Sequence, residues 1–96
     1  MLENKFQSNL IKELKKEFPG CMVLKNDSSY LQGIPDLTIL YNDKWATLEC
    51  KKSVRAKKQP NQEYYVNKMN EMSYAAFVCP ENKTEVIAEL KKKFGE

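Results

Sequence analysis

The chain has 96 residues, 42% of them hydrophobic and 30% charged, which is the composition of an ordinary globular protein and the length of one domain. It contains no histidine and three widely spaced cysteines, which excludes most zinc sites and the serine or cysteine triads that need a histidine base. The net charge of +3 permits nucleic-acid binding without indicating it, and no apolar run approaches the roughly 20 residues that span a bilayer. We therefore expect residues 1–96 to form a single domain in the cytoplasm, or in the host cytoplasm if a virus encodes the chain.

Residues 2–18 have the pattern of an amphipathic helix, which Pro19 and Gly20 end. The apolar stripe of this helix consists of Leu2, Phe6, Leu10, Ile11, Leu14 and Phe18. Glu3 lies at the edge of the stripe, so its carboxylate can face inward along a sheet. The alternative interpretation of Glu3 is a favourable charge in the first turn of a helix.

Residues 21–26, 37–41 and 45–51 are predicted to form three strands, the first mostly buried and the other two joined by a turn at Asn42 and Asp43. Asp36 directly follows Pro35 and opens the second strand. Because side chains alternate across a strand, Glu49 and Lys51 point to one face and Cys50 points to the other. Two acids and one amine therefore converge at one end of the predicted hairpin.

This combination of charges indicates phosphodiester chemistry. Two carboxylates held close together repel each other, so a site that keeps them together usually binds a divalent cation. A lysine beside them can hold an attacking water or offset negative charge that develops on a phosphate. The set therefore suits the hydrolysis of a phosphodiester bond.

The second half of the chain is predicted to add a helix over residues 60–72, a strand over 73–79 parallel to the 45–51 strand, and a last helix over 81–94. The 73–79 run is continuously apolar, which is typical of a strand covered on both faces. The inward face of the 60–72 helix is expected to carry Tyr65, Val66, Met69 and Met72. Gln62 lies one turn before this stripe, where its amide needs a partner: the carboxylates of the site or their bound water, or the end of its own helix.

The motifs Pro35-Asp36 and Glu49-Cys50-Lys51 resemble those of the PD-(D/E)XK nuclease superfamily. The segment Gly-Ile-Pro-Asp-Leu at 33–37, the Glu-x-Lys strand and a later helix with Gln62 are most similar to small VRR-NUC and Holliday-junction-resolvase-like members. The resemblance covers residues 3 to about 80. It implies the α/β (α+β) restriction-endonuclease-like αβββαβ core, with a mixed four-stranded sheet flanked by helices. The residue pattern gives the same order and adds a C-terminal helix.

The resemblance implies a Mg²⁺ or Mn²⁺ site made by Asp36, Glu49, the backbone carbonyl of Cys50 and, directly or through water, Glu3. Asp36, Glu49, Lys51 and Gln62 are then the catalytic residues, with Lys51 orienting or activating the nucleophilic water and Gln62 helping to fix it. The expected protein is a metal-dependent endonuclease acting on branched DNA or Holliday junctions, with little sequence specificity, as a homodimer. The alternatives are a non-catalytic nucleic-acid-binding or regulatory protein that keeps the fold, and a nuclease module that needs a larger protein partner.

Two segments are predicted to contact nucleic acid. The resemblance points to Lys25 with Ser28 or Ser29, in and before the polar loop 26–33, although any strand connection has a similar composition. Residues 51–58 carry five positive charges directly after the Glu-x-Lys strand. A charge run is usually a solvated loop, but beside a phosphate site we expect Lys52, Arg55, Lys57 and Lys58 to bind backbone phosphates.

Overall fold

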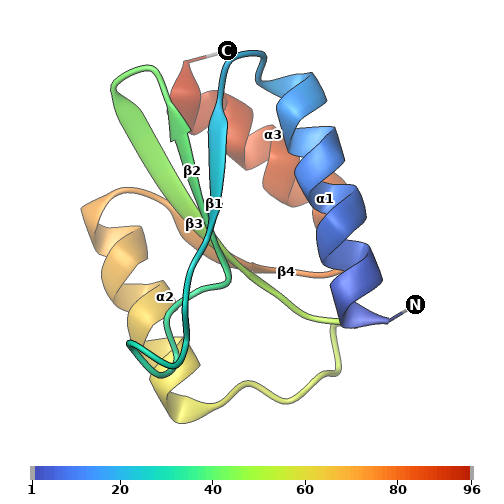
Figure 1. Ribbon diagram of the computed structural model, residues 1–96, viewed down its shortest axis with the longest axis vertical. Helices are drawn as coiled ribbons and strands as arrows, with labels where there is room; N and C mark the ends of the chain where they lie inside the picture. The colour runs from blue at the N-terminus through green and yellow to red at the C-terminus, as the bar shows by residue number, and fades with distance from the viewer. Residues whose placement is uncertain (1, 96) are drawn as a thin grey trace.

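Three helices pack against the two faces of a four-stranded mixed sheet in the computed structural model, which describes residues 2–95 (Figure 1). In chain order the elements are α1 (Glu3–Glu17), β1 (Met22–Lys25), β2 (Leu37–Tyr41), β3 (Lys44–Cys50), α2 (Pro60–Met72), β4 (Ala75–Val78) and α3 (Lys83–Phe94). This arrangement confirms the predicted order of elements and the mixed sheet. The two ends of each predicted element agree with the structure to within two residues.

The sheet has the order β1-β2-β3-β4, in which β1, β2 and β3 are antiparallel neighbours and β4 runs parallel to β3. Tyr41 pairs with Lys44, so Asn42 and Asp43 alone form the turn of the β2–β3 hairpin. Asn42 has a φ of 57°, in the left-handed region that asparagine tolerates better than most residues. The turn therefore fixes the register that later sets Asp36 against Glu49.

The apolar core lies between the sheet and the helices α1 and α3, which cover the same face (Figure 1). The strands contribute alternate residues to this core, α1 and its C-terminal end contribute most of the predicted stripe, and α3 contributes one of its faces. The buried residues are Phe6, Leu10, Leu14, Phe18, Leu37, Ile39, Ala46, Leu48, Cys50, Val78, Val86, Ile87, Leu90 and Phe94. Helix α2 packs on the opposite face, against β3 and β4. The three cysteines are free thiols, and Cys50 and Cys79 are buried.

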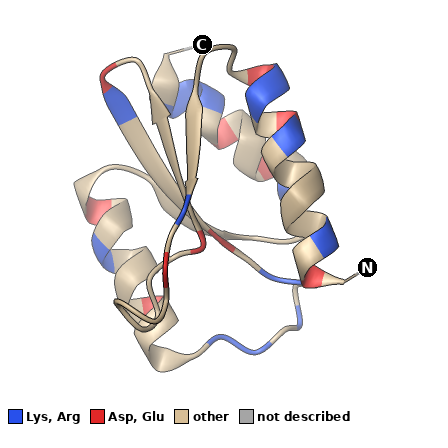
Figure 2. Ribbon diagram, viewed as in Figure 1, with Lys and Arg blue, Asp and Glu red and all other residues tan. Residues whose placement is uncertain are grey.

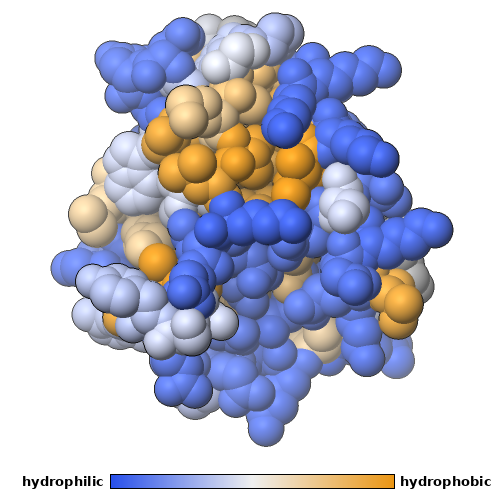
Figure 3. Space-filling model, viewed as in Figure 1, coloured by the Kyte–Doolittle hydropathy of each residue, from blue (hydrophilic) through white to orange (hydrophobic). Residues whose placement is uncertain are grey.

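Helix α2 does not cover the β1 side of the sheet face on which it packs. The predictions that the first strand is mostly buried and that Leu2 and Met72 face inward are wrong. Strand β1 is at the edge of the sheet, and its residues Met22 and Leu24 are exposed together with Leu40 of β2. Figure 3 shows apolar surface over this part of the molecule. Leu2 precedes α1 and is 72% exposed. Met72 is the last residue of α2, where the chain turns toward β4, and is 65% exposed.

No helix within residues 2–95 is both long enough and apolar enough to cross a membrane.

Candidate active site

Strand β3 presents a row of polar residues to the face covered by α2. Alternation along the strand sends Leu48 and Cys50 into the apolar core and directs Thr47, Glu49 and Lys51 toward α2. Glu49 and Lys51 are buried there, with exposed fractions of 4% and 8%. The pairing of Leu37 with Leu48, continued by one residue, sets Asp36 opposite Glu49 on the same face of the sheet.

Backbone N–H groups hold the carboxylates of Asp36 and Glu49 in place. The Asp36 N–H donates a hydrogen bond of 3.1 Å to Glu49 Oε1, and the Cys50 N–H donates one of 2.9 Å to Asp36 Oδ2. Each carboxylate is thus bound to the backbone of the other strand. In a regular strand the N–H and C=O of one residue point to the same side, so the Cys50 carbonyl also faces the Asp36 side.

Gln62 connects helix α2 to this pair. Its Nε2 donates to Glu49 Oε2 at 3.0 Å, and its Oε1 accepts from Lys51 Nζ at 2.8 Å. The same Oε1 accepts the backbone N–H of Gln59 at 3.0 Å, which is half of a capping box at the start of α2. Both interpretations of Gln62 from the sequence therefore hold together: the residue caps its own helix and binds the polar residues of β3.

Burial changes the acidity of the two carboxyl groups. The pKa of Glu49 is raised to about 8, first by burial and then by the negative charge of Asp36, while Lys51 opposes the rise. Burial also raises the pKa of Asp36, against the Cys50 N–H and the charge of Lys51. Without a cation, burial and the charge of Asp36 therefore favour the protonated form of the Glu49 carboxyl. A cation placed between the two groups would release that proton and lower both pKa values.

The loop before β2 sets the position of Asp36. Asn26 donates its side-chain N–H to the Pro35 carbonyl at 2.8 Å, and its backbone N–H donates to the Asp36 carbonyl at 2.8 Å. Gly33 has a φ of 90°, and a Cβ on it would come within 2.6 Å of the Asn61 side chain. The loop can approach the start of α2 only because residue 33 is glycine, and this contact brings Asp36 and Gln62 to the same site.

Glu3 is not grouped with the carboxylate pair. It is exposed in the first turn of α1, on the helical layer that covers the other face of the sheet, although its charge contributes slightly to the raised pKa of Glu49. No three His, Cys, Asp or Glu side chains within residues 2–95 lie close enough together to hold a metal ion. Oxygen atoms that a cation could bind at this site include those of the Asp36 and Glu49 carboxyls and the Cys50 carbonyl.

The predicted phosphate-binding residues are exposed but only partly directed at the site. By alternation Lys25 shares a face with Val23 rather than with Asp36, and Ser29 is bound through its N–H and hydroxyl to Asp27 Oδ1. Ser28 is exposed in the same loop. Figure 2 shows the cations of residues 51–58 along the connection between β3 and α2, where Lys52, Arg55, Lys57 and Lys58 are all exposed.

Three further residues belong to this site, although the sequence pattern did not single them out. Asn26 fixes the backbone on both sides of the Pro35-Asp36 peptide, and a polar residue at a strand end is the only signal it leaves. Gln59 completes the capping box with Gln62, and the Gln-x-x-Gln spacing around Pro60 could have indicated it. Phe77 is the partner of Glu49 on β4, and an apolar strand pattern does not distinguish it from a core residue.

No protein-family model matches the chain, and no curated protein matches it either. The class that the fold and site define is a small α+β domain with a mixed four-stranded sheet and, at one end of β3, a hydrogen-bonded cluster of two carboxyls, an ammonium and an amide, of which Glu49 and Lys51 are buried.

Proposed function

We propose that the chain is a Mg²⁺- or Mn²⁺-dependent endonuclease that hydrolyses phosphodiester bonds of DNA. The observation that supports it is the convergence of Asp36, Glu49, Lys51 and Gln62 into one hydrogen-bonded group at the end of β3. Such a group opposes folding, because two carboxyls and an ammonium lose water when they are buried. Acids with strongly shifted pKa values gather at functional sites, and Glu49 is such an acid.

The donor atoms fit a hard divalent cation, because Mg²⁺ and Mn²⁺ prefer oxygen ligands. Asp36 and Glu49 would supply carboxylate oxygens and Cys50 its carbonyl. The bound ion would polarise the phosphodiester and stabilise the negative charge added to it. Because Glu49 must lose its proton first, cation affinity should rise with pH up to about 8.

Lys51 and Gln62 act on the attacking water and on the phosphate. The Lys51 ammonium is a donor only, and it lies 3.9 Å from Glu49 Oε2, so it can hold a water molecule or a phosphate oxygen beside the acids. Gln62 Oε1 accepts from this ammonium and fixes its direction. The Gln62 amide is itself fixed by the Gln59 N–H, so the start of α2 determines where the water is held.

The test is cleavage of junction, flap and plasmid DNA with Mg²⁺ or Mn²⁺. Asp36→Ala and Lys51→Ala should each reduce the cleavage rate by at least about 100-fold, while Lys92→Ala removes an equal charge from the exposed end of α3 and should cut like the wild type. A wild-type protein as inert as Asp36→Ala would overturn the proposal. If calorimetry also detects no Mn²⁺ binding, a non-catalytic nucleic-acid-binding or regulatory protein is the better description.

We propose branched DNA as the substrate, because a domain of this size has little surface left for reading base edges. A homodimer with two sites would suit the two strands cut at a junction. Light scattering that detects only monomer would contradict paired cutting while leaving single-strand nicking possible. Reconstitution with a larger partner is required if the purified chain binds Mn²⁺ but does not cut.

A further inference from the structure

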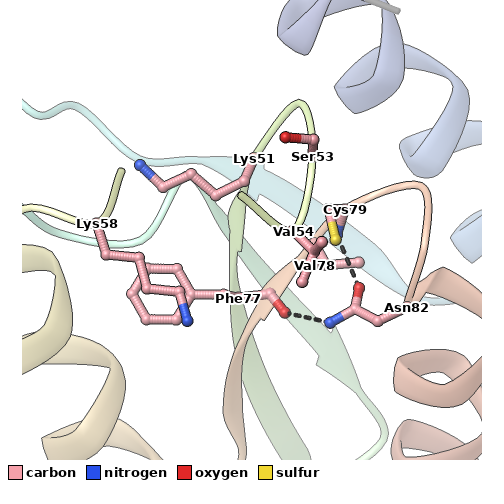
Figure 4. A pocket seen from close by; sticks show the side chains of 8 residues that line it. All are labelled: Lys51, Ser53, Val54, Lys58, Phe77, Val78, Cys79 and Asn82. Atoms are coloured by element: carbon pink, nitrogen blue, oxygen red, sulfur yellow. Dashed lines mark hydrogen bonds between the residues drawn. The ribbon is translucent and has the colours of Figure 1, made fainter. Parts of the chain in front are cut away.

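A pocket beside the proposed active site combines an aromatic ring with two lysines. It is lined by Lys51, Ser53, Val54, Lys58, Phe77, Val78, Cys79 and Asn82 (Figure 4). None of these eight residues is acidic. The pocket shares Lys51 with the site and extends from it toward β4 and the basic connection 51–58.

Phe77 lies one strand away from the proposed catalytic acid. It is the partner of Glu49 in the parallel β3–β4 ladder, so the two side chains project from the same face of the sheet. Adjacent strands are about 4.8 Å apart, which brings the ring within one nucleotide of a phosphate bound at Glu49 and Lys51. Phe77 is half-buried, so part of its ring remains accessible.

Asn82 fixes the backbone that carries this ring. Its side-chain N–H donates to the Phe77 carbonyl at 3.0 Å, and its Oδ1 accepts the Cys79 N–H at 2.8 Å. Figure 4 shows both bonds at the backbone end of Phe77, to the right of its ring. The backbone position of Phe77 is therefore set without a ligand.

A lysine covers the ring in the free protein. Lys58 Nζ lies 4.6 Å from the centre of the Phe77 ring, and its side chain is otherwise exposed. A cation–π contact at an exposed site is weak, and lysine is flexible and strongly hydrated. The ammonium can therefore leave the ring for a phosphate oxygen, which opens the ring face to a flat ligand.

We propose, resting on the nuclease function above, that Phe77 stacks an unpaired nucleobase next to the cleaved phosphodiester while Lys58 binds an adjacent phosphate. An aromatic face and a mobile ammonium next to it match the two chemical parts of a nucleotide, its base and its phosphate. In a continuous duplex the faces of each base are covered by its neighbours, so the ring selects flap, junction or single-stranded DNA, in which a base is free. Phe77 and Lys58 are thus specificity-determining residues rather than catalytic ones.

Binding is measured by fluorescence anisotropy in EDTA, so that the DNA is not cut, on a single strand, a flap and a continuous duplex. Phe77→Leu should weaken single-strand and flap binding about tenfold and leave duplex binding nearly unchanged. Phe77→Trp should bind the single strand and the flap as tightly as the wild type does. Tyr64→Leu removes an exposed aromatic residue outside the pocket and is the control. Melting curves establish that each variant is folded.

Salt dependence separates stacking from charge. Lys58→Gln should lower the slope of log affinity against log salt for single-stranded DNA by about 0.7, and Phe77→Leu should leave the slope unchanged. A 2-aminopurine placed beside the cleaved bond should be quenched by the wild type and by Phe77→Trp, and not by Phe77→Leu.

Equal losses of single-strand and duplex affinity in Phe77→Leu, or no loss at all, would overturn the stacking proposal. If that variant binds normally while the wild type still cuts and Asp36→Ala does not, stacking fails and the nuclease proposal stands. If the wild type does not cut but the ring-dependent binding is observed, the nuclease proposal fails and the nucleotide site stands.

Discussion

Strand β3 is buried on both faces, but the two faces differ in chemistry. Toward α1 and α3 it presents Ala46, Leu48 and Cys50, which pack in the apolar core. Toward α2 it presents Thr47, Glu49 and Lys51, and no buried side-chain nitrogen or oxygen within residues 2–95 lacks a hydrogen-bond partner. Apolar burial stabilises the fold, whereas buried charges need their partners merely to offset the loss of water. The first face therefore stabilises the fold, and the second face carries the residues of the proposed active site.

Adjacent residues of β3 test this division most strongly. Leu48→Ala leaves a cavity in the core and should lower the free energy of unfolding by about 2–5 kcal/mol. Thr47→Val on the other face loses only a 3.4 Å contact from its hydroxyl to Met69 Sδ. This variant should change the free energy of unfolding by less than about 1 kcal/mol. Urea denaturation measures both. Similar losses in the two variants would show that the faces contribute alike.

The pH dependence of stability tests the polar face alone. The folded protein binds a proton at Glu49 up to about pH 8, whereas the unfolded chain releases it near the ordinary value of 4.5. This contribution to stability is complete below about pH 4.5 and is lost as the pH rises to about 8. In EDTA, the wild type should lose on the order of a few kcal/mol across this range, and Glu49→Gln should lose less. Parallel pH profiles for the two proteins would contradict the raised pKa of Glu49.

Substitution of Gly33 tests whether the loop before β2 must approach helix α2 for Asp36 and Gln62 to meet. Both Gly33 and Gly20 have a φ of 90°, but only at Gly33 would a Cβ meet another residue, Asn61. Gly20→Ala should therefore cost about 1 kcal/mol from backbone strain, and Gly33→Ala about 2 kcal/mol, because the loop must also move away from α2. Thermal unfolding measures the difference. DNA cleavage should fall in Gly33→Ala and be unchanged in Gly20→Ala.

Local pattern was enough to predict the elements and the site face. Alternation along residues 45–51 correctly separated Glu49 and Lys51 from Cys50, because the sequence period of a strand fixes the direction of each side chain. The turn at Asn42 and Asp43 then gave the register that sets Asp36 beside Glu49. These features depend on neighbours in the chain, which the sequence displays directly.

Features that depend on how layers pack were not predictable in this way. The exposure of Met22 and Leu24 follows from the position of α2 over β3 and β4, and no periodicity within β1 records that position. Glu3 lies at the right phase of its helix, yet its distance from Asp36 depends on the packing of α1 on the opposite face. Asn26 and Phe77 owe their roles to partners far away in the sequence.

Gln62 combines a local role in its own helix with contacts to a strand that is distant in the sequence. Its substitution has the smallest expected effect. Gln62→Ala removes the bonds to Lys51 and Glu49 along with the reciprocal cap, and should cost about 1 kcal/mol of stability. Gln59→Ala removes the other half of the same capping box but keeps its own backbone N–H, so the contacts of Gln62 to β3 survive. Both variants should unfold at a slightly lower temperature, whereas only Gln62→Ala should slow DNA cleavage. Equal cleavage by the two variants would mean that Gln62 serves the helix alone and that Lys51 is positioned by its own strand.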